Sequence, residues 1–440
     1  MRAVNVLTLA FSVCVFFLGI AVIAWALIRT GYFVSPVKIA IYLVIPGMIS
    51  VSGLFLIFTP AGLRLIVCLC GVAIGVALLL HEAYWQLSQH DKSTNAATAS
   101  AERSKAAGEQ TYPVICGQTV MTMGPAGLVR SAIVVDGKPV QTQAGPAGKL
   151  VRRTLDTVDR KFTVGRTDRF GFNNPPGQWT AEEVKALILG DSFAYGAEVP
   201  FGRGMADHIR AHLGPTVNLA CGGNGPLLAL ASLQEYGVPL RPQIVLWFYY
   251  EGNDLTKDIV KERKSTTLLG YLDPEFSQNL MARQHKINEA LLAFIYAKLE
   301  DRRKAPPTGP PPITFSWRDA VRLSGLRNAL GMNYEFAPES LILFQRALAR
   351  ARDMIATWKG RLVFVYLPGE VRFTSPFAQW DSDGYRRAIL DVVRSEGIDV
   401  IDIVQAFATL DRPRRLYRGH FTEEGHRFVA ERVLERLKQP

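Results

Sequence analysis

Cysteine is scarce in this chain, which excludes a disulfide-rich fold. Only five cysteines occur in 440 residues, and three of them, Cys14, Cys68 and Cys70, lie in long apolar stretches. Cys116 and Cys221 remain for the rest of the chain, where they either form one disulfide or stay as two thiols. Cysteine usage therefore leaves the redox compartment open.

Blocks of one charge sign are also missing. The formal net charge is +11, yet Lys and Arg are interspersed with Asp and Glu, and no basic block carries interleaved aromatic residues. The short basic runs 261–264 and 412–418 are typical of solvated faces or of contacts with anionic lipid or polymer. We therefore expect no nucleic-acid partner.

No pattern in the sequence is typical of a metal or cofactor site. His208 and His212 are four residues apart on an expected helix, a spacing that zinc ligands can have. The arrangement His-Glu-x-x-His is missing, however, and no third ligand is evident. We expect neither a metal nor a cofactor.

Long uncharged runs dominate residues 1–87. They extend roughly from Val4 to Ile28, from Ile39 to Thr59 and from Leu65 to Leu80, and each is about as long as a bilayer requires. The first run is too long for the apolar part of a cleaved signal peptide and is followed by further runs. The pattern predicts three transmembrane helices, so the protein is expected to be a multi-pass protein of the cytoplasmic membrane. Its two ends then lie on opposite sides, but the few basic residues beside the spans are balanced and do not set the orientation.

The remaining chain has three parts. Residues 88–111 are polar and indicate a linker, and residues 112–183 contain short β-prone runs between Gly and Pro turns, typical of a small β-rich annex. Residues 184–440 form an α/β domain, interrupted at 255–338 by charged helical segments and the proline-rich run 305–312.

Strand and helix patterns alternate in the last part, which predicts a parallel sheet covered by helices. The expected strands are 186–189, 216–219, 244–249, 361–367 and 399–403, and the expected helices are 205–213, 227–236, 339–358, 383–396 and 423–437.

A candidate nucleophile follows the first of these strands, in Gly190-Asp191-Ser192. Open α/β sheets place their sites at the carboxyl ends of strands, and this serine has that position. The tripeptide alone fits equally well a turn that caps the next helix.

Three further clusters at strand or helix ends favour the nucleophile. The second strand runs into the glycine-rich turn 221–225, whose backbone N–H groups can approach a substrate closely. The third strand ends near Asn253, whose amide can donate a hydrogen bond to a developing oxyanion. His420 precedes the last helix and offers an imidazole to activate Ser192.

In combination these residues resemble the SGNH, or GDSL-type, hydrolase superfamily, which is named for its Ser, Gly, Asn and His. The resemblance covers roughly 184–254 and 361–437, and it implies a three-layer α/β/α fold with a flavodoxin-like strand order. It also implies that Ser192 is the nucleophile and His420 the general base. The oxyanion hole would consist of the N–H of Ser192 with Gly223 and Asn253, and Gly222 is a neighbouring alternative to Gly223.

The family's usual acid is missing, because Tyr417 stands three residues before His420 where an Asp is common. Asp402 and Asp411 are candidate acids, a backbone carbonyl could serve instead, or the site could operate as a Ser-His dyad. We expect Asp191 and Asp254 to bind loop backbone and thereby orient Ser192 and Asn253.

Residues and resemblance together predict a membrane-anchored serine esterase that acts on O-acetyl or similar ester groups, through an acyl-serine intermediate. Membrane-tethered relatives of this kind modify cell-envelope glycans, which implies an extracytoplasmic catalytic domain. The expected partners are an acylated glycan or small ester, membrane lipid and a membrane acyl carrier. The alternatives are an O-acyltransferase of envelope polysaccharide and a non-catalytic glycan-binding or assembly subunit on the same fold.

Overall fold

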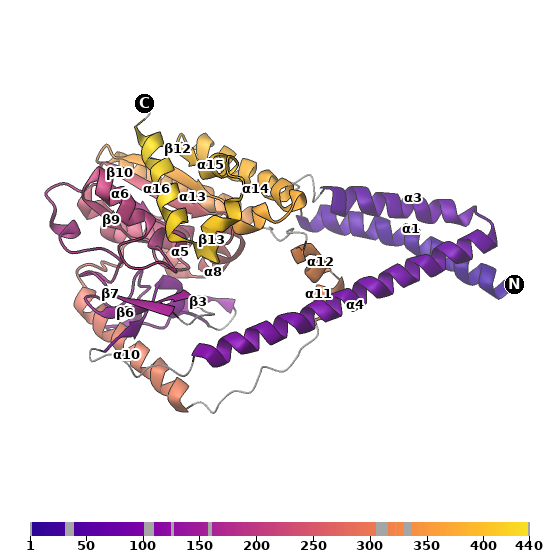
Figure 1. Ribbon diagram of the computed structural model, residues 1–440, viewed down its shortest axis with the longest axis horizontal. Helices are drawn as coiled ribbons and strands as arrows, with labels where there is room; N and C mark the ends of the chain where they lie inside the picture. Colours follow the sequence, from indigo (N-terminus) through magenta and orange to yellow (C-terminus); the bar gives the residue numbers. More distant parts are fainter. Residues whose placement is uncertain are drawn as a thin grey trace. The chain divides into compact units, whose positions relative to one another are not determined.

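The computed structural model describes residues 2–30, 39–100, 110–124, 127–156, 161–304, 316–321, 323–329 and 336–438 (Figure 1). It divides into two compact units. The first contains residues 1–98, 310–338 and 371–388, and the second contains 99–309, 339–370 and 389–440. The proline-rich run 305–312 lies outside the described residues.

The three expected membrane helices are present in the first unit. They are α1 (Arg2–Thr30), α3 (Ile45–Ile57), which continues a π-helical turn at Ala40–Val44, and α4 (Ala61–Ser100). Their segments Arg2–Ala24, Ala40–Ile57 and Ala61–Gln86 are long and apolar enough to cross a membrane, as predicted.

Helices α1 and α3 pack closely because small residues lie at their contact. A Cβ on Gly53 would lie 2.6 Å from the backbone nitrogen of Phe16, so only glycine fits there. The Ser50 hydroxyl donates a hydrogen bond of 2.9 Å to the Phe16 carbonyl. Such contacts are the usual means by which apolar helices associate in lipid.

Two short helices of the same unit lie against α4. They are α11 (Trp317–Val321) and α12 (Ser324–Ala329). The Gln86 side chain exchanges two hydrogen bonds with the backbone of Ser316, and the buried Glu82 carboxylate accepts one from the Gly325 N–H at 2.8 Å. Part of the expected insertion is thus tied to the third span.

The second unit is built around a five-stranded parallel sheet with the order β12-β11-β10-β8-β9. The strands are β8 (Ala186–Leu189), β9 (Thr216–Asn218), β10 (Ile244–Tyr250), β11 (Arg361–Leu367) and β12 (Asp399–Asp402). In chain order this is 2-1-3-4-5, the flavodoxin-like arrangement that was expected. Because the order reverses between β8 and β10, right-handed crossovers place their helices on opposite faces of the sheet. The expected fold class is confirmed.

The helices around this sheet also agree with the sequence pattern. They are α5 (Ser192–Tyr195), α6 (Met205–Leu213), α7 (Pro226–Ser232), α13 (Pro338–Ala356), α14 (Pro376–Ser395), α15 (Ile403–Phe407) and α16 (Glu423–Leu437). Helix α14 begins at Pro376, seven residues before the start expected at Asp383. Residues 377–382 contain neither Pro nor Gly, so no helix-breaking residue prevents the helix from beginning earlier. The remaining described helices of the 255–338 insertion are α8 (Ile259–Glu262), α9 (Thr266–Gly270) and α10 (Gln284–Lys304).

The expected annex is β-rich and belongs to the same unit as the sheet. Its largest part is the sheet β1-β6-β7, made of Tyr112–Pro113, Leu150–Asp156 and Lys161–Arg166. Two hairpins complete it, β2 (Met121–Met123) with β3 (Val129–Ser131), and β4 (Val134–Val135) with β5 (Lys138–Pro139).

A disulfide joins the annex to the α/β core. Cys116 and Cys221, which the sequence left as either a pair or two thiols, are bonded, and their Cα atoms are 5.6 Å apart. The two cysteines are 105 positions apart in the sequence, so the bond closes a long loop. Cys221 opens the glycine-rich turn after β9, so the annex is covalently attached beside the candidate site.

We expect this bond to contribute strongly to stability. Closing so long a loop removes unfolded-state entropy worth about 2–5 kcal/mol. The variant Cys116→Ser/Cys221→Ser of the full chain in detergent micelles should therefore unfold about 5 °C or more below the wild type. Thermal unfolding followed by intrinsic fluorescence measures this shift, and Cys14→Ser/Cys70→Ser, which changes two exposed free thiols, serves as the control. Equal midpoints for both variants would contradict the expectation.

Candidate active site

The nucleophile loop is shaped by Gly190. Its φ is +148°, and a Cβ would lie 2.9 Å from the Phe248 carbonyl oxygen of the neighbouring strand β10, so only glycine fits. Asp191 then caps α5, because its carboxylate accepts a 2.9 Å hydrogen bond from the Phe193 N–H. Ser192 is thereby placed at the first position of α5, just beyond the carboxyl end of β8.

His420 lies beside this serine. It belongs to the short strand β14 (His420–Phe421), which pairs with β13 (Tyr417–Arg418) just before α16. Its Nε2 is 2.9 Å from the Ser192 Oγ, which is hydrogen-bonding distance. The Phe193 ring contacts the imidazole at 4.9 Å between ring centroids and stacks on Tyr250 on another side, so the imidazole is packed against a fixed aromatic pair.

The other imidazole nitrogen faces Glu198, which the sequence analysis did not identify. Glu198 Oε1 is 3.1 Å from His420 Nδ1, and Glu198 Oε2 accepts a 3.3 Å hydrogen bond from the His420 backbone N–H. This Nδ1–Oε1 distance lies within hydrogen-bonding range, although the approach does not meet the geometry of a hydrogen bond. This places a carboxylate in the position that a catalytic triad requires.

The residues that the sequence suggested as the catalytic acid, and the tyrosine at its usual position, lie elsewhere or have structural roles. Tyr417, at the family's usual acid position, is buried and donates a 2.8 Å hydrogen bond to the Pro368 carbonyl. Asp402 caps α15 by accepting from the Val404 N–H at 3.1 Å, and Asp411 is exposed. The structure therefore brings Glu198, rather than Asp402 or Asp411, to His420. The signal that could have indicated Glu198 is its place on the short loop that directly follows the nucleophile helix.

The glycine-rich turn supplies candidate oxyanion donors. Gly223 has φ +75°, a left-handed conformation that glycine adopts readily, and the turn is closed by a 3.0 Å hydrogen bond from Asn224 N–H to the Cys221 carbonyl. A Cβ on Gly222 would lie 3.9 Å from the Ser192 Cβ, so the turn borders the nucleophile. Among the described residues, the N–H groups of Gly222 and Gly223 donate to no protein acceptor, which leaves them available to a substrate.

Asn253 and Asp191 connect the ends of β10 and β8. The Asn253 Nδ2 donates to Asp191 Oδ2 at 3.2 Å, and the Ser192 Oγ is 3.4 Å from the same oxygen. Asp254 accepts a 3.1 Å hydrogen bond from the Tyr250 N–H. The two aspartates thus hold the loops that carry Ser192 and Asn253, in the manner expected from the sequence.

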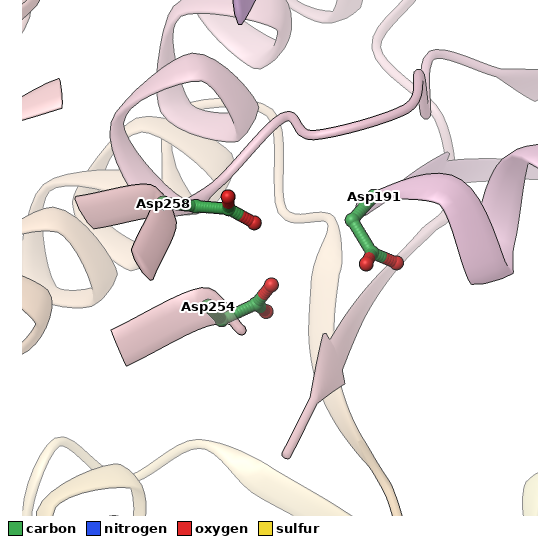
Figure 2. Close-up of side chains that lie close together, drawn as sticks. All are labelled: Asp191, Asp254 and Asp258. Atoms are coloured by element: carbon green, nitrogen blue, oxygen red, sulfur yellow. The ribbon is translucent and has the colours of Figure 1, made fainter. Parts of the chain in front are cut away.

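Three carboxyl groups converge behind this site (Figure 2). One oxygen each of Asp191, Asp254 and Asp258 lies within 4.8 Å of the others, and all three residues are buried. Burial raises the pKa of all three groups. Neighbouring carboxylates raise the pKa of Asp254 and Asp258 further, that of Asp258 to about 9. Carboxyl oxygens are typical ligands of Mg²⁺ and Ca²⁺, whose coordination bound water can complete, but the raised pKa values favour neutral, protonated carboxyls here. Bound protons account for the cluster more simply.

Three further histidines, His426, His208 and His212, make contacts within the core or within one helix. His426 is buried on the first turn of α16, and its Nδ1 accepts a hydrogen bond from the Met205 N–H. Burial lowers the pKa of His426 to about 3, so it is neutral and packs in the core. On α6, the Nδ1 of His212 is bound to the carbonyl of His208 within the same helix.

The elements around the site come from far apart in the chain. Ser192 follows β8, the glycine-rich turn follows β9, Asn253 follows β10, and His420 precedes α16. Strands β8 and β10 are neighbours at the point where the strand order reverses, which is where open α/β sheets bind ligands. The resemblance to SGNH hydrolases is thus confirmed for the fold.

Comparison with known proteins gives the same likeness in structure and none in sequence. No family model and no curated protein sequence matches this chain. Among solved structures, a member of the lipolytic G-D-S-L family from Veillonella parvula is 12% identical over 58% of this chain and 100% of its own, with a TM-score of 0.32. The acetyl xylan esterase AlAXEase is 13% identical over 58% of this chain and 100% of its own, also with a TM-score of 0.32.

A third similar structure is larger. It is a carbohydrate esterase family 2 enzyme with a carbohydrate-binding domain from Corynascus (Myceliophthora fergusii), 12% identical over 72% of this chain and 84% of its own, with a TM-score of 0.31.

The buried carboxyls predict a specific pH dependence of stability. The pKa of Asp258 is about 9 in the folded chain against 3.8 when exposed, so the proton-linked stabilisation is complete below about pH 4 and is lost as pH rises through about 9. Asp258→Asn mimics the protonated group. The fall of the thermal unfolding midpoint between pH 6 and pH 9 should shrink by about half in this variant, because Glu262, whose pKa burial raises to about 7, still titrates in that range. The exposed Asp411→Asn is the control, and an equally steep fall in Asp258→Asn would contradict the assignment.

Proposed function

We propose that this protein is a membrane-anchored serine esterase. The observation that carries the proposal is the 2.9 Å contact between Ser192 Oγ and His420 Nε2 at the carboxyl end of β8. A serine hydroxyl is a weak nucleophile by itself and becomes an effective one when a base accepts its proton at this distance. The Glu198 carboxylate on the far side of the imidazole completes the arrangement.

The proposed reaction has two halves. In the first, His420 Nε2 takes the Ser192 proton while Oγ attacks the ester carbonyl carbon, and the imidazolium then gives this proton to the departing alkoxide. In the second, His420 takes a proton from water, the hydroxide attacks the acyl-serine, and Ser192 recovers its proton as the acid leaves. Glu198 holds the imidazole and stabilises its charged form.

The negative oxygen that forms in each half needs hydrogen-bond donors. The N–H groups of Ser192 and Gly223 and the Asn253 amide are proposed for this role, and Gly222 lies next to them. Removing one such donor in other serine hydrolases costs about 10²–10³ in kcat. The hydrogen bond of Asn253 to Asp191 fixes the direction in which the Asn253 amide points.

We further propose that the substrate is an O-acyl group, such as O-acetyl, on a cell-envelope glycan. Two observations support an extracytoplasmic catalytic unit that could reach such polymers. Three apolar helices tether it to a membrane, and the Cys116–Cys221 disulfide is typical of an oxidising compartment. With three spans and the catalytic unit outside, the N-terminus would lie in the cytoplasm, on the same side as Arg64.

The serine mechanism is tested with purified full chain in detergent micelles and p-nitrophenyl acetate. Ser192→Ala should abolish turnover, and Glu198→Gln should lower kcat by about 10²–10⁴, since it leaves the shape of the side chain but removes its charge. Asp402→Asn and Asp411→Asn are the matched controls and should retain wild-type kcat. Turnover that survives in Ser192→Ala with unchanged thermal unfolding excludes the proposed nucleophile.

The substrate is tested by mass spectrometry of envelope polysaccharide from cells with the wild-type gene, with Ser192→Ala and without the gene. An esterase predicts more O-acyl groups in the two deficient strains than in the wild type. Fewer O-acyl groups would indicate an acyltransferase that works with a membrane acyl carrier. Unchanged acylation would exclude envelope glycan as substrate and direct attention to lipids or small esters. Altered acylation in the deletion strain alone would support a non-catalytic assembly subunit.

A further inference from the structure

Arg153 is a buried arginine of the annex, and both of its hydrogen bonds are to the loop that follows α5. It lies on β6 and is 5% exposed. Its Nη1 donates to the carbonyl oxygens of Gly196 and Val199, the latter at 3.1 Å. Among the described residues no carboxylate pairs with this guanidinium, so its polar contacts are to backbone oxygens.

Aromatic rings enclose the same guanidinium. Its Cζ lies 3.9 Å from the centroid of the Phe201 ring and 4.5 Å from that of Tyr195. Phe201 in turn packs onto the neighbouring annex strand β7, where a Cβ on Gly165 would lie only 2.3 Å from the Phe201 ring. Cation–π contacts are strongest when water is excluded, as it is here.

The loop held in this way carries Glu198. Glu198 has φ +61°, a left-handed conformation that is unfavourable for a residue with a Cβ, and Gly196 has φ +82°. A residue persists in such a conformation only when its surroundings hold it there. The two carbonyls bound by Arg153 belong to residues on either side of Glu198, so the guanidinium spans the strained residue.

We propose that Arg153 is a positioning residue that holds Glu198 against His420. The inference rests on the proposed esterase function, and it makes the annex part of the active-site support. Arg153 touches neither the substrate nor the reacting atoms in this scheme. It acts by fixing the carbonyls of Gly196 and Val199, which sets the backbone of Glu198 and so the distance from its carboxylate to His420 Nδ1.

Steady-state kinetics with p-nitrophenyl acetate test this role in the full chain. Arg153→Met should lower kcat by about 10- to 100-fold, because small displacements of a catalytic group cost this much, with KM changed less than about 2-fold. Arg153→Lys, which keeps a donor and the charge, should recover part of the loss. Arg152→Met is the matched control, since Arg152 is adjacent on β6 and its guanidinium contacts Phe162 instead.

A double-mutant cycle separates positioning from general stability. In the background of Glu198→Gln, where the acid is already lost, Arg153→Met should lower kcat by less than about 2-fold further. The same 10- to 100-fold loss in both backgrounds would overturn the proposal, as would wild-type kcat in Arg153→Met. If Arg153→Met does not fold, the cycle is run with Arg153→Lys and Gly165→Ala, the second of which displaces Phe201.

Hydrogen–deuterium exchange gives a readout that does not depend on activity. The backbone amides of 195–201 should exchange at least about 10-fold faster in Arg153→Lys than in wild type or Arg152→Met. Unchanged exchange of these amides would overturn the proposed positioning role of Arg153 even if the wild type proved inactive. If the wild type is inactive but the exchange changes as expected, the proposed esterase function is refuted, whereas the role of Arg153 in holding the loop is supported.

Discussion

The hydrogen bond between Ser192 Oγ and His420 Nε2 is the contact on which the proposed function of the second unit depends. It joins residues 228 positions apart, so it forms only when the first and last elements of the α/β core are both in place. Gly190 allows the turn that exposes Ser192, and Phe193 packs against the imidazole. The parallel sheet places Ser192 just beyond the carboxyl end of β8, and the antiparallel pair β13–β14 before α16 brings His420 beside it.

Most of the core could be predicted from the sequence, because its signals are local. The runs 186–189 and 361–367 are short, apolar and bounded by turn residues, and they form β8 and β11 with the expected limits. Helices 205–213 and 423–437 likewise have the expected limits, since Gly204 and Thr422 stand at their N-caps. The candidate serine, glycine and asparagine were expected from the ends of these strands, and the candidate histidine from its place before the last helix.

Glu198 could not be predicted in this way, because its place on the loop after α5 does not by itself mark it as the partner of a distant histidine. Its left-handed backbone is rare for glutamate, and its contact with His420 spans 222 residues. The sequence instead indicated Asp402 and Asp411 as the catalytic acid, because both precede His420 by fewer than 20 residues. The pairing of Cys116 with Cys221 was open for the same reason, since a separation of 105 residues carries no information about distance in space.

The disulfide also closes residues 116–221 into a covalent ring, and only some residues of the site belong to this ring. Arg153, Ser192 and Glu198 lie within the ring closed by Cys116 and Cys221, whereas Asn253 and His420 lie outside it. A single cleavage of the backbone anywhere between the two cysteines therefore releases no fragment. A nicked annex would remain attached to the nucleophile and to the turn that faces it, until a reductant opened the ring.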